Sequence, residues 1–85
     1  MVNAKHGVMP AKHILKALGE EIRHRRKPLA MSQEALAHGA GLHRNVIGRL
    51  ERGTYNPTVQ TLLSIAAEFD ISLSELVSSA ERRMR

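Results

Sequence analysis

The apolar residues of this chain recur every three or four positions over most of its length, which is the spacing of amphipathic helices. The clearest stripe follows Thr58 and predicts a helix whose inward-facing residues are Val59, Leu62, Leu63, Ala66 and Phe69. An earlier stripe predicts a helix from Ala11 to about Arg26, and Pro28 then prevents its continuation. No segment alternates for long between apolar and polar residues, so strands are not expected. The predicted fold class is therefore all-α.

Residues that favour helix ends separate the shorter helices. Ser32 is placed to cap the start of a helix over residues 33–38, and the glycines within residues 39–41 are expected to end it. A third helix is predicted over residues 44–52, before Gly53. The second and third helices are thus joined by a short turn that contains glycine.

The last predicted helix begins at a capping motif. Ser72 and Glu75 lie three positions apart, which is the spacing of a capping box. We expect the five helices to form one compact domain over residues 12–80. The remaining residues are expected to form a flexible basic N-terminal arm over residues 1–11 and a basic C-terminal tail over residues 81–85.

The composition excludes several classes of protein. The chain has 85 residues and no cysteine, so it has no disulfide, no thiol nucleophile and no cysteine-ligated metal. Its five histidines lack the spacing of metal ligands, and Glu20 and Glu21 are adjacent and point in different directions on a helix. We therefore expect neither an enzyme nor a metal or cofactor. No apolar run is long enough for a membrane span or a signal peptide, so a cytoplasmic, nucleoid-associated location is expected.

The net charge of +5 lies mostly in residues 1–31 and favours a polyanionic partner. The segment from Gln33 to Glu51 has the form of a helix-turn-helix, in which the second helix enters the major groove of DNA. The side chains expected on the exposed face of that helix are Arg44, Asn45 and Arg49. Arginine pairs well with the edge of guanine, and asparagine with that of adenine.

From Leu18 to Val77 the chain resembles the lambda-repressor-like, or XRE/Cro-type, helix-turn-helix family. The matching segments occur in the family's order and spacing: Ser32-Gln33-Glu34, Leu36-Ala37, Ala40-Gly41-Leu42, Arg49-Leu50-Glu51-Arg52-Gly53, Asn56-Pro57 and Ile71-Ser72-Leu73-Ser74-Glu75-Leu76. The resemblance implies a five-helix fold and sequence-specific binding of double-stranded DNA.

The resemblance also implies roles for individual residues. The positions that match DNA contacts of the family are His43, Arg44, Asn45 and Arg49 for bases, and Gln33, Tyr55 and Asn56 for phosphates. Arg26 and Glu51 match an ion pair that braces the first helix against the recognition helix. His43 stands where the family usually has serine or threonine, so we expect it to cap the recognition helix poorly. Gly48, inside that helix, either lets the helix lie closer to the floor of the groove or is merely tolerated, and the second interpretation is favoured.

Similar proteins dimerise through the last helix, which makes its apolar stripe a candidate dimer interface: Leu73, Leu76, Val77 and Ala80. The expected function is a transcription regulator that represses a two-fold symmetric operator as a homodimer. Two alternatives remain open. In the first, the chain regulates its own operon, either as an antitoxin with a toxin or another protein as partner or as a restriction-modification controller. In the second, it is a protein-interaction module with the same fold.

Overall fold

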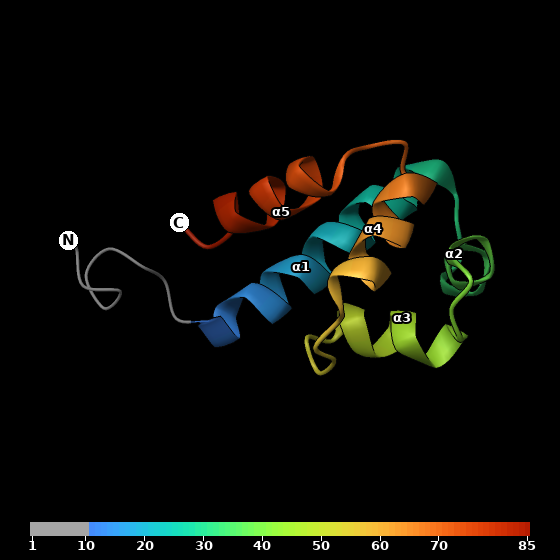
Figure 1. Cartoon of the computed structure of the whole chain (residues 1–85), viewed down its shortest axis with the longest axis horizontal. Helices are drawn as coiled ribbons and strands as arrows, with labels where there is room; N and C mark the ends of the chain where they lie inside the picture. The colour runs from blue at the N-terminus through green and yellow to red at the C-terminus, as the bar shows by residue number, and fades with distance from the viewer. Residues whose placement is uncertain (1–10) are drawn as a thin grey trace.

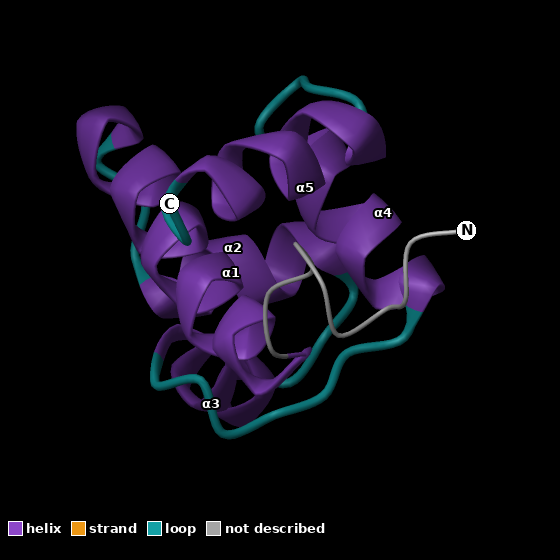
Figure 2. Cartoon of the chain, turned by 90° about the vertical axis from the view of Figure 1, so that its left-hand side faces the viewer, coloured by secondary structure: helices purple, strands orange, loops and turns teal. Residues whose placement is uncertain are grey.

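The helices predicted from the apolar spacing are all present in the computed structural model, which describes residues 11–85 (Figure 1). A short 3-10 helix, which was not predicted, follows the first of them. The elements in chain order are α1 (Ala11–Arg26), η1 (Lys27–Leu29), α2 (Gln33–Ala40), α3 (Arg44–Glu51), α4 (Val59–Glu68) and α5 (Leu73–Arg82). The described range contains no strand, and the all-α prediction is confirmed (Figure 2).

The long helix α1 lies at the centre of the molecule, between α3 and α5 (Figure 1). It contacts α3 on one side and α5 on the other, while α2 packs against both α3 and α4 (Figure 1). Every α-helix contributes to one core, whose fully buried large side chains are Ile22, Leu36, Ile47, Leu50, Ile65 and Leu76. Because all five helices share this core, the position of α3 depends on the packing of the whole domain.

Hydroxyl side chains cap three of the helices. Ser32, Thr58 and Ser72 each accept a hydrogen bond from the backbone N–H three residues later, at 2.9, 3.0 and 3.0 Å. Each bond satisfies an N–H that has no partner within its own helix. The helix starts predicted at Ser32 and Ser72 are confirmed.

The prediction for the inner face of α4 was wrong at two positions. Val59 and Leu63 are 68% and 54% exposed, whereas Ile65, which was not predicted, is fully buried. The buried face is formed by Leu62, Ile65 and Ala66. Both sets have helical spacing, because α4 carries apolar residues on two faces. Periodicity alone therefore could not select the face that points to the core.

Some predicted boundaries also shift. The α2 helix continues through Gly39, and only Gly41 takes the left-handed conformation that ends it. The α5 helix extends to Arg82, two residues into the predicted tail. Residues 1–10 of the predicted N-terminal arm lie outside the described residues. No helix among residues 11–85 has both the length and the apolar character needed to cross a membrane.

Candidate nucleic-acid interface

The turn between α2 and α3 is set by one glycine and one leucine. Gly41 has φ of 70°, a conformation in which a side chain is strained. The next residue, Leu42, donates its N–H to the carbonyl oxygen of Ala37 at 2.7 Å and packs against the core. This arrangement ends α2 with its last carbonyl groups paired and directs the chain into α3.

His43 caps the start of α3, so the expectation of a poor cap was wrong. Its Nδ1 atom accepts a hydrogen bond from the N–H of Asn45 at 3.1 Å. An unprotonated ring nitrogen serves here as the acceptor that a serine oxygen usually provides. Because Nδ1 accepts this bond, a proton of the exposed ring lies on Nε2.

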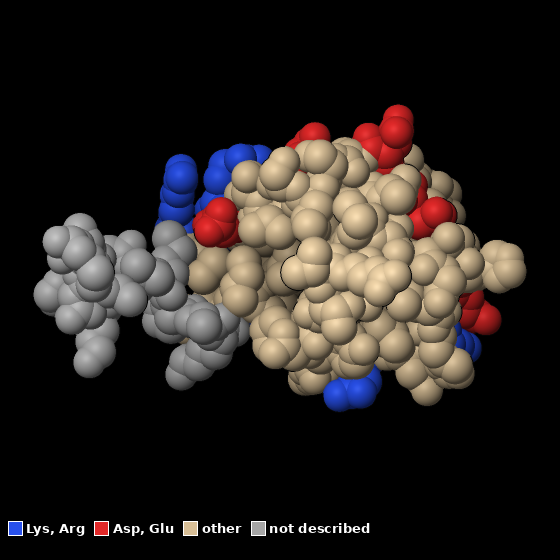
Figure 3. All heavy atoms as spheres, in the orientation of Figure 1, with Lys and Arg blue, Asp and Glu red and all other residues tan. Residues whose placement is uncertain are grey.

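The α3 helix separates apolar and polar side chains sharply. Ile47 and Leu50 are buried against α1 and α2, whereas Arg44, Asn45 and Arg49 are exposed. The exposed side of α3 and the start of α2 line a shallow concave region of about 330 Å³. We call it the recognition surface; its residues are Gln33, Arg44, Asn45, Gly48, Arg49 and Arg52. It brings together four of the seven predicted DNA contacts. Figure 3 shows basic side chains on the lower side of the molecule, the side on which α3 lies in Figure 1.

The predicted ion pair between Arg26 and Glu51 is formed and braces α3 against α1. The carboxylate of Glu51 accepts from Nε and Nη2 of Arg26 at 2.7 and 3.0 Å. The two side chains are only 12% and 5% exposed, and the hydrogen bond to Glu51 raises the pKa of Arg26. Gln33 donates Nε2 to the same carboxylate at 3.1 Å, and Arg26 donates Nη1 to the carbonyl oxygen of Met31 at 2.8 Å. The carboxylate of Glu51 thus fixes the end of α3 to α1 and to α2.

A close approach of α1 to α3 reinforces this brace. A Cβ atom at Gly19 would overlap the backbone carbonyl oxygen of Leu50 and lie 2.9 Å from that of Glu51. Only glycine leaves room for the two backbones at this separation. The C-terminal end of α3 is therefore held by backbone packing as well as by charge.

Tyr55 contacts Arg49 rather than projecting freely from the loop after α3. The guanidinium carbon of Arg49 lies 5.1 Å from the centre of the Tyr55 ring, within the range of a cation–π interaction. The Nη2 atom of Arg49 also donates to the carbonyl oxygen of Thr54 at 3.4 Å. These two contacts restrict the rotamers of Arg49 before any ligand binds. Asn56 is exposed beside them, and neither it nor Tyr55 lines the recognition surface.

Comparison with known proteins identifies the family. The model of a helix-turn-helix family matches residues 22–76, which is more than half of the chain. The chain belongs to this family of DNA-binding transcription regulators. The resemblance to lambda-repressor-like domains, inferred from the sequence motifs, is confirmed.

Individual relatives of the family are similar over most of this chain. It is 38% identical over 65 residues to control protein C.SmaI of Serratia marcescens, covering 76% of this chain and 77% of that protein. It is 35% identical over 60 residues to the immunity repressor protein of Bacillus phage phi105, covering 71% of this chain and 42% of the repressor. The solved structure of the restriction-modification controller protein C.AhdI from Aeromonas hydrophila matches with a TM-score of 0.70 and 37% identity, covering 73% of this chain and 94% of that one.

Within this helix-turn-helix protein, Arg52 is a recognition-surface residue that sequence reasoning missed. Its Nη1 atom lies 3.3 Å from the position that a Cβ atom of Gly48 would occupy, and Oε1 of Gln33 lies 3.7 Å from the same point. Gly48 thus leaves space for Arg52 to fold back over α3. The available signal was the four-residue spacing between Gly48 and Arg52, which places both on one side of a helix.

The predicted dimer stripe of α5 is only partly at the surface. Leu76 and Ala80 are fully buried in the core of the protomer and have no surface for a partner. Leu73 and Val77 are half-buried, so the predicted face is reduced to these two residues. The burial of Leu76 and Ala80 follows from the packing of α5 on α1.

No group of three or more histidine, aspartate or glutamate side chains in the described range is placed to hold a metal ion.

Proposed function

We propose that this protein is a sequence-specific regulator that binds double-stranded DNA by inserting α3 into the major groove. One observation carries the proposal: the exposed face of α3 presents Arg44, Asn45 and Arg49 on a helix whose far end is fixed by the buried pair of Arg26 and Glu51. Base reading needs side chains held in a fixed register with the base edges, and a braced helix supplies that register. The only ion pair of Arg44 among the described residues is a weak, exposed contact with Glu34 at 3.7 Å, which DNA would displace at little cost.

Phosphate contacts would set the position of the protein on the duplex. We assign them to Gln33, Asn56 and Tyr55, as the family resemblance implies, and add Arg52, which lies at the edge of the recognition surface. Because Gln33 gives one Nε2–H to Glu51, the donors left toward phosphate are its second Nε2–H and the backbone N–H at the start of α2. Tyr55 would act partly through its contact with Arg49. His43 has Nε2–H available for a base edge or a phosphate.

The active form is proposed to be a homodimer that represses transcription from a two-fold symmetric operator and remains associated with the nucleoid without enzymatic activity. Its support is the exposed apolar face of α4, where Val59 and Leu63 lie one turn apart. The centre of the face seen in Figure 3 is almost free of charged side chains. Pairing of this face, together with Leu73 and Val77, would remove the apolar area from water and match two half-sites.

The test begins with selection of bound duplexes from a random library, which returns the half-site, its spacing and its symmetry. Arg44→Ala and Arg49→Ala are then measured on the selected site and on unrelated duplexes, with Arg85→Ala as a control of equal charge change at the C-terminus. We expect each α3 variant to lose about 1–3 kcal/mol on the selected site and to relax the base preference. Equal losses on all duplexes, or no loss relative to the Arg85 variant, would contradict base reading.

A salt titration separates DNA binding from the alternative of a protein-interaction module. Contacts to phosphates release counterions, so the affinity for the selected site should fall steeply with salt concentration. We expect a shallower slope for Arg52→Ala, because one phosphate contact is lost. A flat dependence on salt would exclude the proposed mode of binding.

A second candidate function is control of a restriction-modification operon. It is favoured by the controller proteins among the relatives, because this chain is 38% identical over 65 residues to C.SmaI and 37% identical to C.AhdI with a TM-score of 0.70. The observation that tests it is the neighbouring sequence in the genome. An adjacent endonuclease or methyltransferase gene, with the selected operator between the genes, would support a controller, and an operator far from such genes would exclude it.

A further inference from the structure

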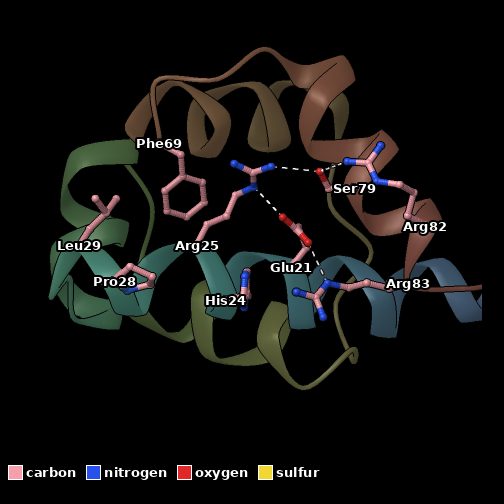
Figure 4. Close-up of a pocket in the computed structure, with 9 residues that line it drawn as sticks. All are labelled: Glu21, His24, Arg25, Pro28, Leu29, Phe69, Ser79, Arg82 and Arg83. Carbon is pink, nitrogen blue, oxygen red and sulfur yellow. Dashed lines mark hydrogen bonds and ion pairs between the residues drawn. The ribbon is translucent and has the colours of Figure 1, made fainter.

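A cleft of about 570 Å³ lies between α1 and α5 and has no role in the proposed DNA interface. We call it the α1–α5 cleft. Its lining comes from α1, η1, α5, the residue after α5 and the end of α4, and includes no residue of α3. Figure 4 shows that its two ends differ in chemistry, with basic side chains at one end and apolar side chains at the other. Its volume falls in the range of pockets that hold small molecules.

The polar end is built around two buried groups, Glu21 and Ser79, which are 5% and 7% exposed. The carboxylate of Glu21 accepts from Nε of Arg25 at 2.6 Å and from Nε of Arg83 at 2.8 Å. The Oγ atom of Ser79 accepts from Nη2 of Arg25 at 3.0 Å and from Nη2 of Arg82 at 2.8 Å. Three guanidinium groups from two sides of the cleft therefore converge on these two residues (Figure 4).

This cluster carries more positive charge than its carboxylates neutralise. Three arginines face the buried Glu21 and the exposed Glu75, whose carboxylate lies 3.4 Å from Arg25. Burial would raise the pKa of Glu21, but the hydrogen bonds and charges of Arg83 and Arg25 outweigh it and hold the pKa below 4.5. Glu21 is thus already ionised at neutral pH, and a net positive charge of at least one remains.

Several hydrogen-bond donors of the cluster have no acceptor among the described residues. Among the described residues no group accepts from Nη1 of Arg25, from either Nη atom of Arg83, or from Nε and Nη1 of Arg82. The hydroxyl of Ser79 accepts two hydrogen bonds, and no described group accepts its proton. Such a set of fixed donors is complementary to an oxyanion, which can take two parallel hydrogen bonds from one guanidinium.

The opposite end of the cleft is apolar. Pro28 and Leu29 from η1 and Phe69 from the end of α4 form its wall, and Leu29 is 55% exposed. Figure 4 places these three side chains on the far side of Arg25 from Arg82 and Arg83. An occupant that lies along the cleft would therefore meet guanidinium groups at one end and apolar carbon at the other.

We propose that the α1–α5 cleft binds a small organic anion in which a carboxylate or phosphate group is joined to an aromatic or aliphatic body. The oxyanion pairs with Arg82, Arg83 and the hydroxyl of Ser79, and the apolar body covers Leu29 and Phe69. The layout favours one amphipathic ligand over a bare ion, because an ion would leave Leu29 in water. The site is independent of α3, so its test requires no DNA.

The experiment follows backbone amide NMR signals of the full chain during titration with matched probes. The probe 3-phenylpropionate carries both halves of the expected ligand, and phenyl phosphate replaces its carboxylate by a phosphate. Propionate and inorganic phosphate carry the anionic half alone, while 3-phenyl-1-propanol carries the apolar half alone. We expect saturable shifts at the α1–α5 cleft with the first two probes, and the tighter of the two identifies the preferred oxyanion.

Two variants test the two ends of the cleft. Arg82→Gln removes a charge whose only side-chain hydrogen bond among residues 11–85 is to Ser79, and Arg85→Gln removes the same charge outside the cleft. We expect Arg82→Gln to weaken 3-phenylpropionate about tenfold, equivalent to about 1.4 kcal/mol, and Arg85→Gln to leave it unchanged. Leu29→Ser should weaken 3-phenylpropionate without affecting propionate. Thermal unfolding of each variant verifies that the fold is retained.

The outcomes decide between a ligand site and nonspecific ion binding. Saturable shifts that need both halves of the probe, and that Arg82→Gln weakens, support the proposal. Equal affinity for propionate and 3-phenylpropionate would mean an adventitious ion only. Absence of shifts at the cleft, shifts confined to α3, or equal effects of Arg82→Gln and Arg85→Gln would each overturn the proposal.

Discussion

Two buried carboxylates tie α1 to its neighbours, one on each side of the helix, and their partners differ. Glu51 is paired with the single guanidinium of Arg26, and both side chains are almost withdrawn from water. Glu21 is shared between Arg25 and Arg83, whose side chains are 23% and 31% exposed. The first group joins α1 to α3, and the second joins α1 to α5.

The difference shows that the burial of a carboxylate does not by itself define its role. On the α3 side one negative charge meets one positive charge, and each nitrogen of the Arg26 guanidinium donates to a protein acceptor, so the group is complete and fixes geometry. On the α5 side the cations outnumber the carboxylates and stay in contact with solvent. A complete group suits a brace, whereas an incomplete one leaves donors for a ligand.

The largest effect is expected when the brace on the α3 side is broken. Glu51→Gln leaves the buried guanidinium of Arg26 without a counter-charge and should reduce the free energy of unfolding by about 3–5 kcal/mol. Urea denaturation measures this change. Glu34→Gln is the matched control, because its side chain is 69% exposed, and it should change stability by about 0.5 kcal/mol or less. A loss below about 1 kcal/mol for Glu51→Gln would show that α3 is not held by this pair.

Substitution of a glycine tests the contact between α1 and α3 without changing the charge of the protein. Gly19→Ala forces the backbones of α1 and α3 apart and should destabilise the fold by about 1–3 kcal/mol. Gly39→Ala is the control, because its Cβ would meet only the flexible carboxylate end of Glu68, and alanine is favoured in a helix by about 0.5–1 kcal/mol. Equal urea midpoints for the two variants would contradict the close approach of α1 to α3.

A smaller effect is expected on the α5 side. Glu21→Gln should reduce the free energy of unfolding by about 1–2 kcal/mol at pH 7, because its arginine partners retain access to water. The pKa of Glu21 is below 4.5 in the folded protein, so the unfolded chain binds the proton first as the pH falls. The stabilisation by ionised Glu21 is therefore present above the unfolded pKa and is lost in acid. Urea denaturation at pH 7 and pH 3 should show that the difference in the free energy of unfolding between wild type and variant becomes smaller in acid. A constant difference would contradict stabilisation by ionised Glu21.

The smallest change in stability is expected within the recognition surface itself. Gly48→Ala should stabilise α3 by about 0.5–1 kcal/mol through helix propensity, since the flexible end of Arg52 can move from the new Cβ atom. The same change should weaken binding to the selected operator, because Arg52 no longer folds over Gly48. Binding assays with Gly48→Ala and Arg52→Ala check this result. Unchanged affinity in Gly48→Ala would restore the interpretation of Gly48 as merely tolerated.

Features that rest on local sequence were predictable. The cap at Ser32 depends on a few neighbouring residues.

The family resemblance added one contact that local sequence could not predict. Arg26 and Glu51 are distant in sequence, and their ion pair was predicted only because they match a pair of the family. Leu63 was assigned to the wrong face because α4 is apolar on two sides.

Features that arise from packing between distant segments were not predictable. The hydrogen bond between Glu21 and Arg83 joins residues 62 positions apart, and no sequence motif predicts it. Gly19 carries no signal of its own, because the group that it must avoid is the backbone of α3. The capping role of His43 depends on which ring nitrogen faces the helix, and the residue type does not fix that choice.

The contact of Arg49 with Tyr55 has an optical consequence. The chain contains no tryptophan and one tyrosine, so Tyr55 is the source of its intrinsic fluorescence. That single emitter sits 5.1 Å from the guanidinium of a proposed base-reading side chain. If Arg49 leaves the ring to engage a base, the surroundings of the phenol change, and its emission should change with them. The unlabelled protein thus carries a fluorescent reporter beside its recognition surface, and its emission can be used to follow the binding of each duplex.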